Sequence, residues 1–129
     1  MKPFSRDRSS LFGTSLYLLI GPLAWAAHMT VVYGSHTLLC TIGAQQPALW
    51  GVSPSAVVIA AATIAALGIV AGFVLARRPA ARLLRVPRDP PPLRRFIDGS
   101  MLWLGFLSGA GIAWAGATVL LLDSCAQMR

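Results

Sequence analysis

Charged side chains are rare in this chain, and one long stretch has none. Asp, Glu, Lys and Arg make up 12% of the 129 residues, about half the share that is usual in soluble domains. No such residue occurs between Ser9 and Ala76. A stretch of this length without charge cannot cover a water-soluble core, because that surface must be polar. The composition therefore excludes an ordinary soluble domain and predicts an integral membrane protein.

Acidic side chains are the scarcest, and they lie outside the apolar segments or at their ends. The four acids are Asp7, Asp89, Asp98 and Asp123. With them no serine–histidine–acid set can be assembled, and the chain has no glycine-rich nucleotide loop. We therefore expect a protein that is not an enzyme, with no metal or cofactor of its own.

Three apolar segments are long enough to cross a bilayer, which requires about 20 residues. They cover about 12–40, 54–76 and 97–122. Ser53 before Pro54 is typical of a helix start, since serine caps the first turn and proline fits its first position. The sequence thus predicts an all-α fold, a three-helix bundle that forms a single transmembrane domain over residues 1–129.

The basic residues indicate how the helices are oriented. Ten of the eleven lysines and arginines fall before the first span or between the second and third. The positive-inside rule places these segments in the cytoplasm and the 41–53 connection and C-terminus outside. We expect a multi-pass protein of the bacterial inner membrane. The net charge of +7 is then a topology signal with some attraction to anionic lipid, and no recognition module suggests nucleic-acid binding.

The basic loop 77–95 is rich in proline, which favours an extended polyproline geometry over a helix. Its prolines include Pro87, Pro90, Pro91 and Pro92. We interpret the loop as a semi-rigid cytoplasmic connector. A strap that docks on an acidic partner surface is the alternative.

Two spans carry small residues at spacings of four, the pattern by which membrane helices approach closely. The second has Gly68 and Gly72, and the third has Gly105 and Gly109. These two faces are expected to pack against each other inside the bundle. Alternatively, at least one of them docks onto a larger membrane complex.

The segment "GPLAWAAHMTVVYGSHTLLC", residues 21–40, keeps two histidines in an apolar span. His28 lies near mid-membrane, where a polar side chain normally faces protein. We expect it to be a buried hydrogen-bonding group against a neighbour, and we hypothesise that this neighbour is another subunit. His36 lies closer to the outer interface, and Pro22 predicts a kink around residues 18–22.

Haem or metal binding by these histidines is an alternative. The rise from His28 to His36 is about 12 Å, too far for one ion to reach both. No histidine lies outside the first span, so a haem would need a second copy, a partner subunit or a methionine such as Met101. The spacing of soft ligands is likewise a weak indication of copper.

The two cysteines lie on the outward side in this topology. Cys40 ends the first span and Cys125 follows the third. An even count in an oxidising compartment favours a disulfide between them. Two unpaired thiols remain an alternative, and metal ligation by the pair is a further one.

The first span also resembles a family of small bacterial membrane proteins whose genes tend to lie beside those for haem–copper cytochrome c oxidases. The resemblance rests on Gly21-Pro22, Trp25 and His28, followed by Tyr33 and Cys40. It extends to "RRF" at 94–96 and "LLLDSC" at 120–125; His36 is not part of it. The resemblance implies an accessory or assembly subunit of a respiratory oxidase, in which Gly21, Pro22, Trp25, His28 and Tyr33 are interface or buried polar positions.

A second hypothesis is a haem- or quinone-associated membrane anchor, similar in size to those of succinate dehydrogenase, which also have three spans. In those anchors the haem histidine is carried on a different span, and no serine–arginine quinone pair is evident in this sequence. A free-standing membrane protein is the third hypothesis.

Overall fold

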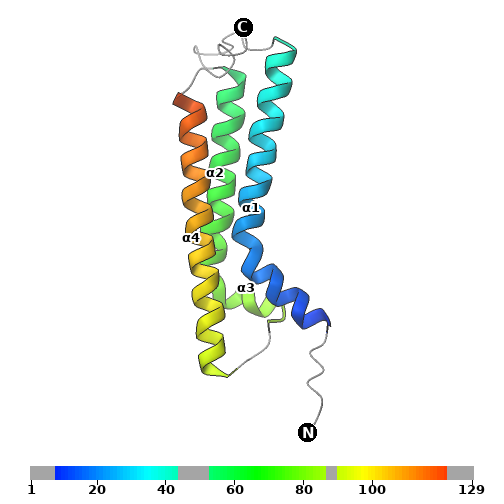
Figure 1. Ribbon diagram of the computed structural model, residues 1–129, viewed down its shortest axis with the longest axis vertical. Helices are drawn as coiled ribbons and strands as arrows, with labels where there is room; N and C mark the ends of the chain where they lie inside the picture. The colour runs from blue at the N-terminus through cyan, green and yellow to red at the C-terminus, as the bar shows by residue number, and fades with distance from the viewer. Residues whose placement is uncertain (1–7, 44–52, 87–89, 122–129) are drawn as a thin grey trace.

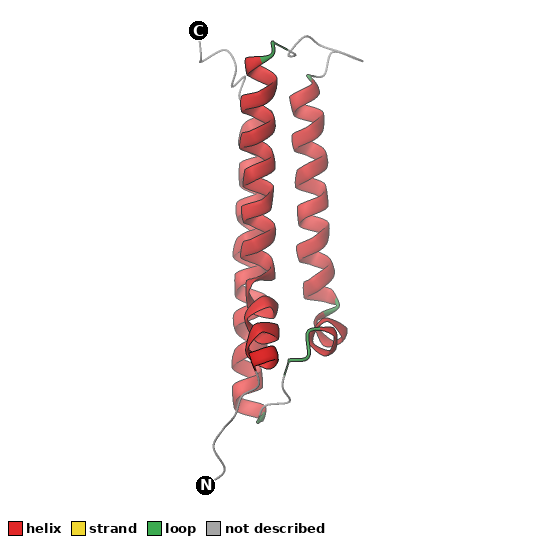
Figure 2. Cartoon of the chain, turned by 90° about the vertical axis from the view of Figure 1, so that its right-hand side faces the viewer, coloured by secondary structure: helices red, strands yellow, loops and turns green. Residues whose placement is uncertain are grey.

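The computed structural model describes residues 8–43, 53–86 and 90–121, and helices are the only regular secondary structure within them. The helices are α1 (Arg8–Thr41), α2 (Pro54–Leu75), α3 (Arg77–Leu83) and α4 (Pro91–Leu121). Three of them, α1, α2 and α4, are long and apolar enough to cross a membrane. The described residues form no strand (Figure 2). An all-α protein with three candidate spans is therefore confirmed.

The three long helices lie side by side, and each contacts the other two (Figure 1). Helices α1 and α4 run in one direction, and α2 runs in the other. The start of α1, the short helix α3 and the start of α4 lie at the same end of the bundle. We call it the basic end, because Arg77, Arg78, Arg82, Arg85, Arg94 and Arg95 lie there.

The expected boundary of the second span is correct. Ser53 caps α2, its hydroxyl oxygen accepting a hydrogen bond from the Ala56 backbone N–H at 3.4 Å, and Pro54 is the first helical residue. The helix ends at Leu75, one residue before the expected end.

The expectation of an extended loop over residues 77–95 is wrong in its described part. Residues Arg77–Leu83 form α3, and α4 begins at Pro91, well before residue 97. Proline is compatible with both helices because it lies in their first turns, where a backbone N–H would have no helical acceptor. Pro87 lies outside the described residues.

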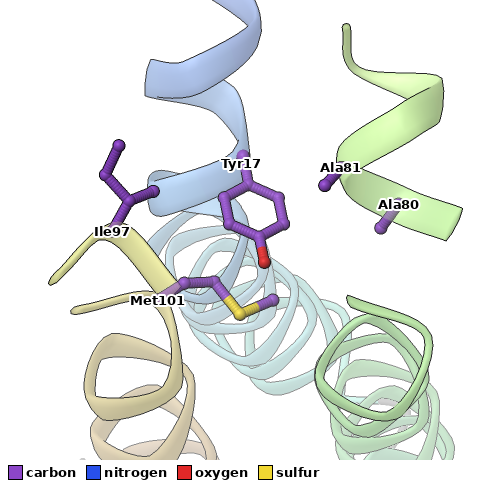
Figure 3. Close-up of a cluster of buried hydrophobic side chains, with 5 residues drawn as sticks. All are labelled: Tyr17, Ala80, Ala81, Ile97 and Met101. Atoms are coloured by element: carbon purple, nitrogen blue, oxygen red, sulfur yellow. The ribbon is translucent and has the colours of Figure 1, made fainter. Parts of the chain in front are cut away.

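A compact cluster of side chains joins α3 to the spans at the basic end (Figure 3). Its buried members come from α1, α3 and α4 and are Tyr17, Ala80, Ala81, Ile97 and Met101. A second cluster lies between α2 and α4 and contains Ala66, Val70 and Ile112. The short helix is therefore a packed part of the bundle, not a linker beside it.

Large apolar side chains cover the outside of the bundle, as expected where lipid is the solvent. Trp103 and Trp114 are among them. Both lie on the outward face of α4, and the Trp103 ring meets Phe106 edge-on at 6.3 Å between centroids.

Helix α1 changes direction in its first part, drawn in blue in Figure 1. Pro22 lies inside this helix, and proline both removes one backbone hydrogen bond and presses on the preceding turn. The bend carries the first turns of α1 toward α3. There a Cβ at Gly13 would overlap the Leu84 carbonyl oxygen, so glycine is required for this contact.

Candidate functional site

His28 is buried inside the bundle, with 3% of its surface exposed. Its Nε2 lies 3.0 Å from the Thr63 hydroxyl oxygen of α2. The same hydroxyl lies 2.7 Å from the Ile59 carbonyl oxygen and donates its hydrogen to it. The His28–Thr63 hydrogen bond joins α1 to α2 near the middle of both helices.

The hydrogen-bond chain favours the tautomer of His28 that carries its hydrogen on Nε2. A threonine hydroxyl has one hydrogen to donate, and Thr63 gives it to the Ile59 carbonyl. Thr63 must then accept a hydrogen bond from His28 Nε2–H. In the neutral ring Nδ1 is left with a lone pair, and this buried atom has no hydrogen-bond partner among the described residues.

Glycines on α4 allow this helix to come close to the level of the bundle at which His28 and Thr63 lie. A Cβ at Gly116 would lie 2.6 Å from the Thr63 hydroxyl oxygen, and one at Gly111 would lie 3.1 Å from Trp25 Nε1. Larger residues at either position would push α4 away at this level. The His28–Thr63 pair is thus enclosed by all three spans.

Gly21 forms a second close approach, between α1 and α4. A Cβ there would lie 3.1 Å from Gly105 Cα and equally close to the Ser108 hydroxyl oxygen. Ser108 is itself buried. Gly21 therefore serves a contact within the chain, directly beside Pro22 at the bend.

The sequence hypothesis assigned the partner of His28 to another subunit, whereas the structure places the hydrogen-bonding group, Thr63, in the same chain. The first helix alone could not reveal this, because the partner lies on α2. The signal available was a hydroxyl residue near the middle of an otherwise apolar span.

Tyr33 differs from the other residues of the 21–40 pattern. It is 70% exposed on the outer surface of α1, and a Cβ on the adjacent Gly34 would meet nothing within 4 Å. Both residues thus face outward, away from α2 and α4, on the half of α1 that is farther from the basic end.

The two small-residue faces do not pack against each other as expected. Gly105 lies against α1 and α2, where its Cβ would come 3.1 Å from Val74 Cγ2, and Gly109 faces Leu67. Gly68 and Gly72 have open space at the same positions. The reason is geometric: each lies two residues from the buried Val70, which on a helix is a rotation of about 160°.

Near the other end of α1, His36 is close to a cysteine. Its Nδ1 lies 3.7 Å from Cys40 Sγ, one helical turn along. Cys125 lies outside the described residues, so the Cys40–Cys125 disulfide stays a prediction.

The candidate ligands for haem or metal are dispersed in the described part of the chain. No three side chains of His, Cys, Asp or Glu come together there in a metal-binding group. Met101 is buried beside Tyr17 in the basic-end cluster, and His28 is not a member of that cluster.

A polar cluster at the basic end was missed by the sequence analysis. The Tyr17 hydroxyl donates a hydrogen bond to Asp98 Oδ1 at 3.1 Å, and Arg94 Nε lies 3.7 Å from Asp98 Oδ2. The i,i+4 spacing of Arg94 and Asp98 was a readable signal. The tyrosine was not, since its partner is distant in sequence.

Comparison of the chain with protein-family models, curated protein sequences and solved structures gave no match.

Proposed function

We propose that this protein is a non-catalytic accessory or assembly subunit of a bacterial respiratory haem–copper cytochrome c oxidase. The observation that carries the proposal is a division within the oxidase-associated pattern. Gly21, Trp25 and His28 meet α2 or α4 of this chain, whereas Tyr33 projects outward. A position that matches the pattern without an inward contact is available to a partner.

The extent of outward surface supports the same proposal. Between 17% and 22% of the residues in the most apolar window of each span are buried inside the chain. The rest can contact lipid or another subunit. Aromatic side chains such as Tyr33 are enriched where proteins meet, and the neighbouring Gly34 allows a second helix to approach closely.

The test is purification of the tagged chain from native membranes in mild detergent, followed by mass spectrometry. We expect oxidase subunits in fixed proportion with the wild-type chain, and a several-fold lower yield with Tyr33→Ala. Val31→Ala is the matched control, because Val31 is also exposed on α1 but faces another direction and is not part of the pattern. Recovery of the chain alone would refute the proposal.

A haem-associated anchor is a second candidate, favoured by the buried Nδ1 of His28, which has no hydrogen-bond partner in the described part of the chain. Ligation through this nitrogen would require the enclosing helices to part, because the ring is enclosed by all three spans. A haem absorption spectrum in the purified protein that disappears in His28→Leu would support the anchor; a colourless preparation would oppose it.

The orientation belongs to the proposal too: the basic end faces the cytoplasm, and the ends of α1 and α4 face the periplasm in the inner membrane. An oxidising periplasm would then allow the Cys40–Cys125 disulfide. In intact cells, neither cysteine of the wild type should react with a membrane-impermeant thiol reagent, whereas Cys125 should react in Cys40→Ser. Labelling of both wild-type cysteines without reductant would contradict the disulfide.

A further inference from the structure

The short helix α3 packs against α1 and α4 at the basic end of the bundle. It follows α2 almost without a break, since the Ala80 backbone N–H bonds the Ala76 carbonyl oxygen at 2.9 Å. Ala80 and Ala81 are buried against Tyr17 and the start of α4 (Figure 3). One flank of α3 therefore holds it in the bundle, and the other flank is left beside the outward face of α2.

A groove lies in the corner between α2 and this outer flank of α3. Its volume is about 780 Å³. The residues that line it come from both helices and include Gly68, Gly72, Phe73, Pro79, Arg82 and Leu83. The two glycines deepen it, because neither position carries a Cβ and each is open to the outside. From Gly68 to Ala76 the apolar part runs about 12 Å along α2.

A small cationic pocket adjoins this groove. It measures about 220 Å³ and is lined by Arg78, Arg82 and Arg94 together with Ala81 and Val86. Arg82 also lines the groove, so one side chain borders both spaces. Asp98 offsets part of the charge of Arg94 through their contact of 3.7 Å, whereas Arg78 and Arg82 are exposed at the mouth.

We propose that this corner binds an anionic glycerophospholipid from the leaflet at the basic end. Its phosphate lies among the arginines, whose guanidinium groups match phosphate oxygens in charge and geometry. One acyl chain lies along the groove over Gly68 and Gly72. Basic pockets beside apolar surfaces at the cytoplasmic side of membrane proteins recognise anionic headgroups in this way.

The shape of the corner favours a lipid over a helix of another chain. A spanning helix laid on the Gly68–Gly72 stripe would meet α3, because Pro79, Arg82 and Leu83 of α3 line the same groove. It would also bring its apolar side chains against Arg82. A lipid fits both parts of the corner. Its apolar acyl chain would lie where glycines line the groove, and its anionic headgroup would lie where arginines line the pocket.

The test is native mass spectrometry of the purified full chain, titrated in detergent with phosphatidylglycerol or with phosphatidylcholine of the same acyl chains. We expect the wild type to retain one phosphatidylglycerol in preference to phosphatidylcholine. Arg82→Gln should weaken phosphatidylglycerol binding about tenfold, as expected for loss of a charge-assisted contact. Gly72→Leu should weaken both lipids by filling the groove.

Two variants serve as controls. Arg95→Gln removes a charge from the same end at a residue that lines neither space. Gly99→Leu adds the same side chain at another open glycine near that end. Both should bind phosphatidylglycerol like the wild type, and circular dichroism should give equal helix content throughout.

Other outcomes would overturn the proposal. Equal losses from Arg82→Gln and Arg95→Gln would indicate nonspecific charge attraction. Competition by inorganic phosphate with no effect of Gly72→Leu would indicate an anion pocket without a lipid groove. A wild-type dimer that Gly72→Leu converts to a monomer, with lipid binding unchanged, would assign the groove to a second copy of the chain.

Discussion

Two glycine pairs with the same spacing have opposite positions in this bundle. Gly105 and Gly109 of α4 face the other spans, and Gly105 lies in close contact with Val74 of α2. Gly68 and Gly72 of α2 face outward with open space above them. The glycine spacing therefore indicates where a helix can be approached closely, and the large residues on the rest of the helix decide which face turns inward.

The largest expected effect comes from placing the same side chain on both faces. Gly105→Leu should lower the free energy of unfolding by about 1–3 kcal/mol, because the added atoms overlap α1 and α2. Gly68→Leu should change it by less than about 0.5 kcal/mol, as expected for an outward position. Unfolding by SDS in mixed micelles, followed by circular dichroism, measures both values. Equal losses would abolish the distinction between the inward and outward pairs.

The inward face also depends on the His28–Thr63 hydrogen bond, which a double-mutant cycle can isolate. His28→Leu and Thr63→Val each remove one partner of the 3.0 Å contact. We expect a coupling energy of about 0.6 kcal/mol, the usual value for such bonds between membrane helices, and at most about 1.7 kcal/mol. The same unfolding measurement supplies all four states. Strictly additive losses would mean that the two side chains only fill space.

An effect of comparable size is expected at the basic end, where Tyr17 bonds Asp98 at 3.1 Å. Tyr17→Phe keeps the ring in its cluster and removes the hydroxyl, so the free energy of unfolding should fall by about 0.5–1.5 kcal/mol. In the Tyr17→Phe background, Asp98→Ala should then lower the free energy of unfolding only by the small amount that the Arg94–Asp98 contact contributes. A full additional loss would show that the tyrosine hydroxyl does not depend on Asp98.

The spans were predictable from sequence because their signal is local: an apolar run, a capping serine and a charge boundary. The pairing of faces was not, since α2 is apolar on every face except at Ser55 and Thr63, and its glycine stripe does not indicate which side turns inward. Helix α3 was missed because proline was taken as opposed to helix, although Pro79 lies in the first turn of that helix. His28 was correctly expected to need a polar neighbour, but Thr63 is separated from it by a connection whose geometry the sequence does not specify.

The tight fit at Gly13 has a consequence for how the protein is made. The bent first part of α1 rests on the backbone at Leu84, a residue that is synthesised after the whole of α1. Until α2 has crossed the bilayer and α3 has formed, the start of α1 lacks the surface that holds it. The first span must therefore stay incompletely folded at first, and it reaches its final bent conformation only after α3 has formed.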